Sequence, residues 1–192
     1  DPQGQAPKGY DESQRGRADG FIALSQRHWD EVSAHQRVGT RFFTAPNGVV
    51  SRRELPEQAP ERREPDGPLR FVMLSRIVEH KNPHLLVEAL SGLTEYDWQL
   101  SIFGDGPDRQ RLEALTPESV RDRVHWRGWS PGPEHALADC DVLCVPSRSE
   151  AFPLVILEAM ARAVPVIGSA VCSVPDMLDH GSGVVVDPID VP

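Results

Sequence analysis

The residues best placed to do chemistry in this sequence are charged side chains that follow short apolar runs. Arg76 and Lys81 come after the run FVML, in a loop that ends where Asn82 and Pro83 predict the N-cap and first residue of a helix. Two cations beside the positive end of a helix favour a site for a phosphate group. The alternative is that both are solvated loop charges with Glu79 between them.

Two carboxylates stand eight residues apart around the start of another predicted helix. Glu150 lies in the loop after VLCV, where a carboxylate can accept hydrogen bonds from ligand hydroxyl groups. Glu158 is the only carboxylate in PLVILEAMAR, a helix that is apolar nearly all round and is therefore expected to be buried. A buried carboxylate needs a partner or a ligand, because uncompensated burial is costly. The alternative partner is Arg162, one helical turn further on.

A third apolar run, WQLSIF, ends at Gly104-Asp105-Gly106-Pro107. A dinucleotide-binding fingerprint would need a third glycine at position 109, which is Arg109, and no P-loop lysine follows. The small residues let a ligand or another backbone segment come close. The alternative is a tight turn with no ligand.

The elements that must position these side chains alternate along the chain. Strands are predicted at 21–24, 42–45, 69–74, 98–103, 124–126, 141–145, 164–167 and 184–186. Helices are predicted at 26–36, 83–90, 107–115, 133–138, 153–162 and 174–178, four of them with proline as first residue. This pattern predicts an α/β fold, a doubly wound, mostly parallel sheet with helices on both faces. Ligands of such sheets bind outside the carboxyl ends of the strands.

Length and composition limit the number of domains and the kinds of partner. At about 150 residues per domain, 192 residues make one domain with tails. Residues 1–19 are predicted to be a polar tail or interdomain linker, and 20–192 one domain with a polar excursion at 51–68. The net charge of −9 argues against a nucleic-acid partner but allows a small anionic ligand.

Several observations favour a cytoplasmic protein. No stretch approaches the roughly 18 apolar residues that span a bilayer, so no transmembrane segment is expected in this chain. The first residues are polar and carry no signal-peptide pattern. The three cysteines, Cys140, Cys144 and Cys172, are odd in number and lack paired C-x-x-C spacing. Neither a disulfide framework nor a zinc site is therefore expected. No two histidines fall at H-x-x-x-H spacing within a helical pattern, so no metal site is expected.

Several segments together resemble one known family. SEAFPLVILEAM resembles the E-x7-E signature of retaining glycosyltransferases of the GT4 type, which have the GT-B fold of two similar lobes. The other matching segments follow in the family's order: APNGV, LSRIVEHKNPHLLVEAL, LSIFGDGPDRQRL, VHWRGW, DCDVLCVPSRSEAFP, AVPVIGSAVCSVPDML and GSGVVVDP. The resemblance runs from about residue 19 to residue 188 and identifies residues 20–192 as the C-terminal, donor-binding lobe, Rossmann-like in fold.

The resemblance implies that the lobe binds a nucleoside-diphosphate sugar, without a metal or other cofactor. Arg76 and Lys81 would hold the donor diphosphate, and Glu158 would bind the ribose hydroxyls. Glu150, the catalytic residue, would contact the donor sugar. The remaining contacts would come from Gly104 and from the backbone of Phe152, Pro153 and Leu154. The strip from Arg127 to Trp129 would meet the base, although Trp129 could instead cap the core.

The sequence departs from the family pattern in a few places. Cys172 and Ser173 replace the usual glycine pair, Asp176 replaces a glutamate, and Val50 stands where an acid often follows NGV. Pro153 often corresponds to glycine in the family and lacks an N–H that could meet a phosphate. These departures bear on sugar specificity and on the phosphate contacts.

The family's second lobe is expected to be missing from this chain. The chain is interpreted as a fragment that lacks the acceptor-binding N-terminal lobe and is inactive alone, with any membrane association arising through that lobe. The function expected is transfer of a sugar to an acceptor hydroxyl with retention, in glycan, glycolipid or polysaccharide biosynthesis. The alternatives are a lobe of a sugar phosphorylase or nucleotide-sugar epimerase, or a non-catalytic nucleotide-binding module.

Overall fold

The computed structural model describes residues 19–33, 39, 41–49, 67–179 and 181–186. The chain forms two compact units, residues 1–47 and residues 48–192, which we call unit 1 and unit 2. The division differs from the single domain expected over 20–192, because the first two strands pair with each other in a sheet of their own. The predicted tail up to residue 18 and the excursion up to residue 66 lie outside the described residues.

Unit 1 is a strand, a helix and a second strand. β1 (Gly20–Ala23) and β2 (Arg41–Thr44) pair in parallel, and α1 (Gln26–Ser33) connects them. Trp29 of α1 stacks on Phe42 with ring centroids 4.6 Å apart. On the other face of this small sheet, Ile22 and Phe43 are paired in register and are 65% and 55% exposed.

Unit 2 contains a six-stranded sheet in which all neighbouring strands run parallel, in the order β5-β4-β3-β6-β7-β8. Its strands are β3 (Leu69–Leu74), β4 (Trp98–Phe103), β5 (Val124–Gly128), β6 (Val142–Val145), β7 (Val166–Ser169) and β8 (Gly183–Val186). Its helices are η2 (Glu79–Lys81), α2 (Pro83–Ser91), α3 (Arg109–Ala114), η3 (Glu118–Arg123), α4 (Pro133–Ala136), α5 (Leu154–Met160) and α6 (Val174–Leu178). This architecture confirms the predicted doubly wound α/β fold.

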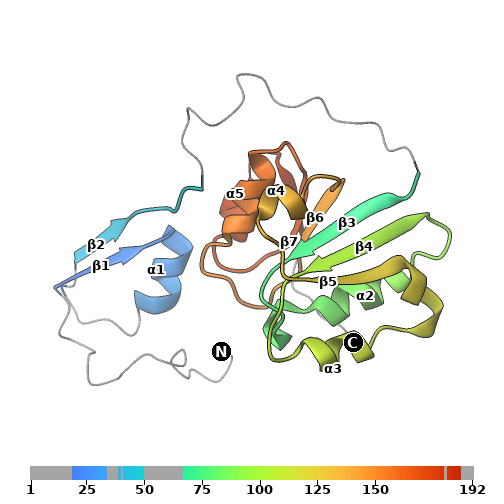
Figure 1. Ribbon diagram of the computed structural model, residues 1–192. Helices are drawn as coiled ribbons and strands as arrows, with labels where there is room; N and C mark the ends of the chain where they lie inside the picture. Colours follow the sequence, from blue (N-terminus) through green and yellow to red (C-terminus); the bar gives the residue numbers. More distant parts are fainter. Residues whose placement is uncertain (1–18, 34–38, 40, 50–66, 180, 187–192) are drawn as a thin grey trace. The chain divides into compact units, whose positions relative to one another are not determined.

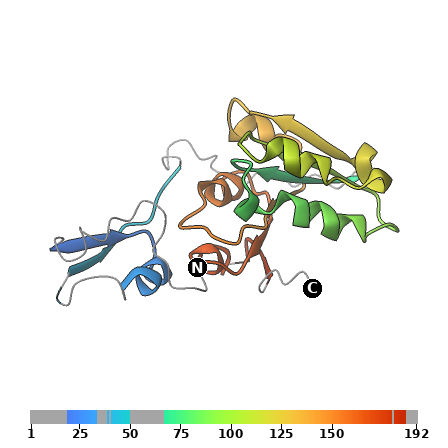
Figure 2. The same ribbon diagram turned by 90° about the horizontal axis from the view of Figure 1, so that it is seen from below.

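Helices cover both faces of the large sheet, as Figure 1 shows for α2 and α3 on one side and α4 and α5 on the other. Side chains alternate between the faces along each strand. Thus Met73 of β3 packs in one core cluster with α2 and α3, while its neighbour Val72 packs in a second cluster with α4, α5 and α6. Viewed from below in Figure 2, α2 and α3 lie side by side.

The sheet changes winding direction between β3 and β6. The chain passes from β3 through α2 to β4 on one side, and from β6 through α5 to β7 on the other. The connections therefore diverge at this point and leave a crevice between the loops that follow β3 and β6. Ligands of open α/β sheets bind at such a topological switch point.

Two helical predictions need correction. Two of the four prolines, Pro107 and Pro153, precede the helices that they were expected to begin, since α3 starts at Arg109 and α5 at Leu154. The expected full burial of α5 is also wrong. Leu154 is 42% exposed, because α5 packs on the sheet along the side that carries Ile156 and Ala159.

Candidate active site

A pocket of about 340 Å³ lies at the switch point, beyond the carboxyl ends of β3 and β6. The loop after β3 contributes Ser75, Arg76 and Lys81, and the loop after β6 contributes Ser147 and Glu150. Of the eight residues predicted to form the site, six line this pocket: Arg76, Lys81, Glu150, Phe152, Pro153 and Leu154. The fold thus brings together residues that lie up to 78 positions apart, from Arg76 to Leu154.

Lys81 and Glu150 form an ion pair across this pocket. The Nζ of Lys81 contacts Oε1 of Glu150, and the Oγ of Ser147 donates a hydrogen bond of 2.7 Å to the same oxygen. The two charged side chains are only 19% and 10% exposed, so solvent screens their attraction weakly. Sequence reasoning assigned both charges to a ligand and missed Ser147, although its position three residues before Glu150 was a usable signal.

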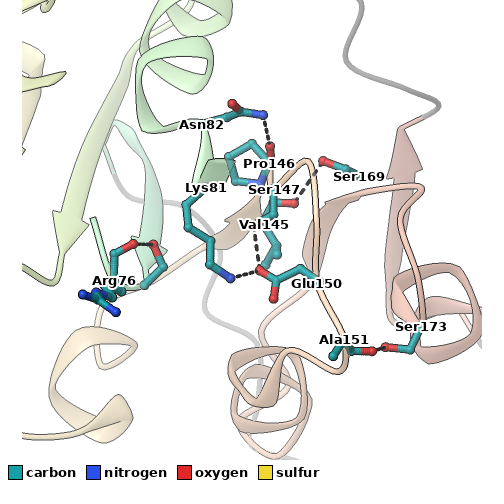
Figure 3. A network of polar contacts seen from close by, with 11 residues as sticks. Arg76, Lys81, Asn82, Val145, Pro146, Ser147, Glu150, Ala151, Ser169 and Ser173 are labelled. Atoms are coloured by element: carbon teal, nitrogen blue, oxygen red, sulfur yellow. Dashed lines mark hydrogen bonds and ion pairs between the residues drawn. The ribbon is translucent and has the colours of Figure 1, made fainter. Parts of the chain in front are cut away.

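Arg76 presents an unpaired cation to the pocket. Its side chain is exposed, and within the part of the chain that the structure describes its guanidinium has no ion pair. In Figure 3 it lies on the opposite side of Lys81 from the loop of Glu150. Arg76 is thus free to bind an anion with its planar, multi-donor group.

Asn82 joins the two loops of the site. It is the N-cap of α2 and Pro83 is the first helical residue, as predicted, but the backbone of Asn82 is left-handed (φ 54°) and its side chain makes no cap hydrogen bond. Instead its fully buried Nδ2 donates to the carbonyl oxygen of Pro146 at 2.9 Å (Figure 3). The backbone N–H of Arg148 donates to the carbonyl oxygen of His80 at 2.8 Å, which ties the same two loops a second time.

Two serines on and after β7 hold the loop of Glu150 from the other side. The Oγ of Ser169 donates to the carbonyl oxygen of Val145 at 3.3 Å, and the Oγ of Ser173 to that of Ala151 at 2.7 Å (Figure 3). Both serines are buried. The loop is therefore fixed through its backbone on both sides of Glu150, a feature that the sequence pattern did not reveal.

Gly104 lies outside the pocket lining, in the loop after β4. Its backbone has φ 126°, and a Cβ there would overlap the carbonyl oxygen of Ser75. Its N–H donates to the carbonyl oxygen of Gly128 at 2.7 Å. Of the two possibilities left open for this turn, the structure shows the close approach of another backbone segment. The predicted ligand contact of Gly104 stays a prediction.

Glu158 also lies outside the pocket lining, one turn of α5 beyond Leu154. The predicted ion pair with Arg162 is not formed, since Nη1 of Arg162 donates to the main-chain oxygen of Glu158 at 2.8 Å. No described residue donates a hydrogen bond to the carboxylate of Glu158. Partial burial raises the pKa of Glu158, while the charge of Arg162 opposes that shift.

The segment from Arg127 to Trp129, predicted to contact the nucleotide base, lines a different pocket. Arg127 and Trp129 line a concavity of about 440 Å³ beside β3, β4 and β5, together with Gln99 and Ser101. Trp129 is 75% exposed, so it does not cap the core. Its contact with a base stays a prediction.

The described ranges 19–33, 39, 41–49, 67–179 and 181–186 contain no metal-ligand cluster, disulfide or membrane-spanning helix. Within them no three His, Cys, Asp or Glu side chains gather as metal ligands would. Cys140, Cys144 and Cys172 form no disulfide within these ranges, and burial raises the pKa of Cys144 to about 12. None of the helices described is long and apolar enough to cross a membrane.

Comparisons with known proteins agree on one family. A family model described as "Glycosyl transferases group 1" matches residues 55–191. The chain is 29% identical over 172 residues to a lipopolysaccharide 1,6-galactosyltransferase of Salmonella typhimurium, covering 85% of this chain and 46% of that protein. It is 34% identical over 113 residues to the N-acetyl-alpha-D-glucosaminyl L-malate synthase of Bacillus anthracis, covering 58% of this chain and 30% of that protein.

The solved structures agree with the family model. The apo form of the lipopolysaccharide outer core galactosyltransferase WaaB superposes with a TM-score of 0.74 at 28% identity, covering 90% of this chain and 50% of that one. The chain spans less than half the length of each of the two curated relatives named above.

Proposed function

Since this chain belongs to the group 1 glycosyl transferases, we propose that unit 2 binds a nucleoside-diphosphate sugar and presents it for transfer to an acceptor hydroxyl. The observation that carries the proposal is the pocket at the switch point, where Arg76, Lys81 and Glu150 meet. Cations there match a diphosphate, and a carboxylate matches sugar hydroxyls. Membership of this family favours transfer over phosphorolysis, epimerisation and non-catalytic binding.

The roles proposed for the site residues are those that the resemblance to the family implies. Arg76 and Lys81 bind the diphosphate and neutralise the charge that develops on it as the bond to the sugar breaks. Glu150 faces the sugar, and Glu158 binds the ribose hydroxyls, which would satisfy its partly buried carboxylate. Because two cations already stabilise the leaving group, no divalent metal is needed.

The stereochemical outcome proposed is retention at the anomeric carbon. The acceptor hydroxyl then approaches on the face of the sugar where the diphosphate leaves. Holding two reactants in such a geometry lowers the activation barrier by about 7–11 kcal/mol. That requires protein surfaces on both sides of the reacting atoms. Unit 2 provides the donor side alone, so we expect this chain to transfer no sugar at a useful rate.

Unit 1 is proposed to belong to the acceptor-binding lobe. It forms a sheet separate from that of unit 2, and the family-model match begins at residue 55, beyond it. Ile22 and Phe43 leave one face of that sheet apolar and exposed, as expected for part of a larger sheet whose covering layer is supplied from elsewhere. This proposal revises the expectation that the acceptor lobe is entirely missing.

Calorimetric titration of this chain with UDP, GDP, ADP and their hexose conjugates tests the proposed function. We expect one nucleoside diphosphate to bind, and Arg76→Ala to weaken it by about 1.5–3 kcal/mol, the range for hydrogen bonds to charged groups. Arg121→Ala is the matched control, because Arg121 is an exposed cation of η3 paired with Glu118. Binding should weaken with added salt and be indifferent to a chelator. Failure to bind any of these ligands would refute the proposal.

A further inference from the structure

We propose that Glu150 shifts the preference of this pocket away from a free nucleoside diphosphate and toward a sugar-linked diphosphate, because it offsets part of the charge of Lys81. The inference rests on the proposed function, namely that the pocket binds the diphosphate group. It adds a role that is independent of any contact between Glu150 and the sugar, and it concerns how the pocket distinguishes donor from product.

The ion pair that carries this inference is part of the pocket before any ligand arrives. Lys81 and Glu150 both line it, and their contact is reinforced by Ser147, whose side chain is almost fully buried. A ligand phosphate that approaches Lys81 therefore meets a cation whose charge is already partly offset by Glu150. It also approaches a carboxylate in a setting where solvent screens little.

Glu150 cannot easily move away from the ligand. The carbonyl oxygen of Pro146 is held by Asn82, and that of Ala151 by Ser173, on either side of the glutamate. Arg148 is also joined to His80 of the cation loop through the backbone. The negative charge is thus fixed in place, as a preorganised group must be if it is to discriminate between ligands.

Glu150 weakens the preference of the pocket for a more negative ligand. Among the described residues that line the pocket, the charged ones are Arg76, Lys81 and Glu150, so the lining carries one net positive charge. A sugar-linked diphosphate has one negative charge on each phosphate. A free nucleoside diphosphate gains a further charge on its terminal phosphate above a pKa of about 6. The fixed carboxylate repels that additional charge.

The consequence is easier exchange of product for donor. After transfer, the leaving nucleoside diphosphate carries the additional charge, so Glu150 repels it more strongly than it repels the incoming donor. Release of product limits turnover in many enzymes, so a fixed carboxylate at this position would shorten that step. The pocket gives up affinity for the diphosphate group in return for this selectivity.

The test compares dissociation constants for three ligands of this chain, measured by calorimetry at pH 7.5 and low salt. The ligands are a nucleoside diphosphate (UDP, GDP or ADP), its hexose conjugate and its β-methyl ester. The methyl ester has the reduced charge of the donor but no sugar. In the unchanged chain we expect the free diphosphate to bind less than tenfold more tightly than the methyl ester. Binding of the free diphosphate tenfold more tightly would overturn the inference, and this measurement requires no variant.

The variant Glu150→Gln removes the charge but keeps an oxygen that can accept from Lys81 and Ser147. We expect it to shift the ratio of the two dissociation constants, free diphosphate against methyl ester, at least about fivefold toward the free diphosphate. Glu79→Gln is the matched control, since Glu79 is an exposed carboxylate in the loop of Lys81 that pairs with Arg111 outside the pocket. This variant should leave the ratio within about twofold.

The outcomes separate this inference from the proposed function. An unchanged ratio in Glu150→Gln, with all three ligands still bound, overturns the inference and leaves the proposed function standing. An equal shift in Glu79→Gln also overturns it, because any removed charge would then have the same effect. If the unchanged chain binds none of the three ligands, both are refuted together.

Discussion

Glu150 and Glu158 differ more in their surroundings than their sequence spacing suggests. Glu150 sits in a loop, yet its side chain is only 10% exposed and contacts Lys81 and Ser147. Glu158 sits on a regular helix, yet no described residue donates a hydrogen bond to its carboxylate, and burial raises its pKa. The loop residue is thus the more firmly held of the two.

The physical reason lies in what each element can supply. A helix fixes where a side chain starts but offers partners only at neighbouring positions on its own surface. The loop of Glu150 is fixed from outside, by Asn82 of the neighbouring loop and by Ser169 and Ser173 beyond it. A carboxylate whose hydrogen-bond partners belong to the fold, such as Glu150, is held by them. A carboxylate without such partners, such as Glu158, can still accept hydrogen bonds from a ligand.

The largest effect is expected when Glu150 is made to resemble Glu158. Lys81→Met removes the cation and leaves a mostly buried carboxylate unpaired, which should destabilise unit 2 by about 3 kcal/mol in urea denaturation. Arg162→Met, beside Glu158, should cost less than about 1 kcal/mol, because the ion pair of Arg162 is with Glu134, whose side chain is 68% exposed. The double variant Lys81→Met/Glu150→Gln should recover most of the loss. Equal losses of unfolding free energy in the two single variants would contradict the proposed difference between Glu150 and Glu158.

The next largest effect tests whether the loop tie through Asn82 matters. Asn82→Ala loses the hydrogen bond to Pro146. It also forces an alanine, which has no side-chain polar group, into the left-handed backbone conformation, so we expect about 2 kcal/mol of stability to be lost. Asn82→Gly loses the hydrogen bond but adopts that backbone freely, so about 1 kcal/mol is expected. Thermal denaturation ranks the two variants, and a glycine variant as unstable as the alanine one would contradict this account.

A smaller effect separates the two partners of Glu150. Ser147→Ala removes one hydrogen bond to Oε1 and leaves the contact with Lys81, so about 1 kcal/mol of stability should be lost. Ser130→Ala is a suitable control, because the Oγ of Ser130 donates to the backbone of Gly132 in another loop. If chemical denaturation finds no loss for Ser147→Ala, the ion pair alone positions the carboxylate.

The smallest effect is expected at Glu158 and depends on pH. Its folded-state pKa is raised, so the native state binds more protons than the unfolded state at pH values between the ordinary and the raised pKa. Ionisation therefore costs stability as pH rises through that window, and the cost is present in full above it. Glu158→Gln should stabilise the chain by up to about 0.5 kcal/mol at pH 7. The gain should disappear at pH 3.5, where the carboxyl is protonated in both states. A gain that grows on acidification would contradict a raised pKa for Glu158.

Local patterns in the sequence were enough to find the elements of this fold. In the described part of the chain, strand and helix alternation predicted the eight strands and the six α-helices within a few residues, but not the short helices η2 and η3. Hydrophobic periodicity and proline positions act over short distances. The same patterns placed Arg76, Lys81 and Glu150 at strand ends. Resemblance to the family then supplied their roles, which composition and spacing could not.

Tertiary structure decided what depends on strand order and on long-range contacts. Neither the adjacency of β3 and β6 nor the separation of unit 1 follows from any local pattern, because pairing joins segments far apart in the chain. The partner of Asn82 lies 64 residues away and that of Lys81 lies 69 away, so both contacts exist only once the sheet has formed. The sequence determined which side chains face the crevice. Only the folded sheet decided which of them are already paired there and which are free to bind a ligand.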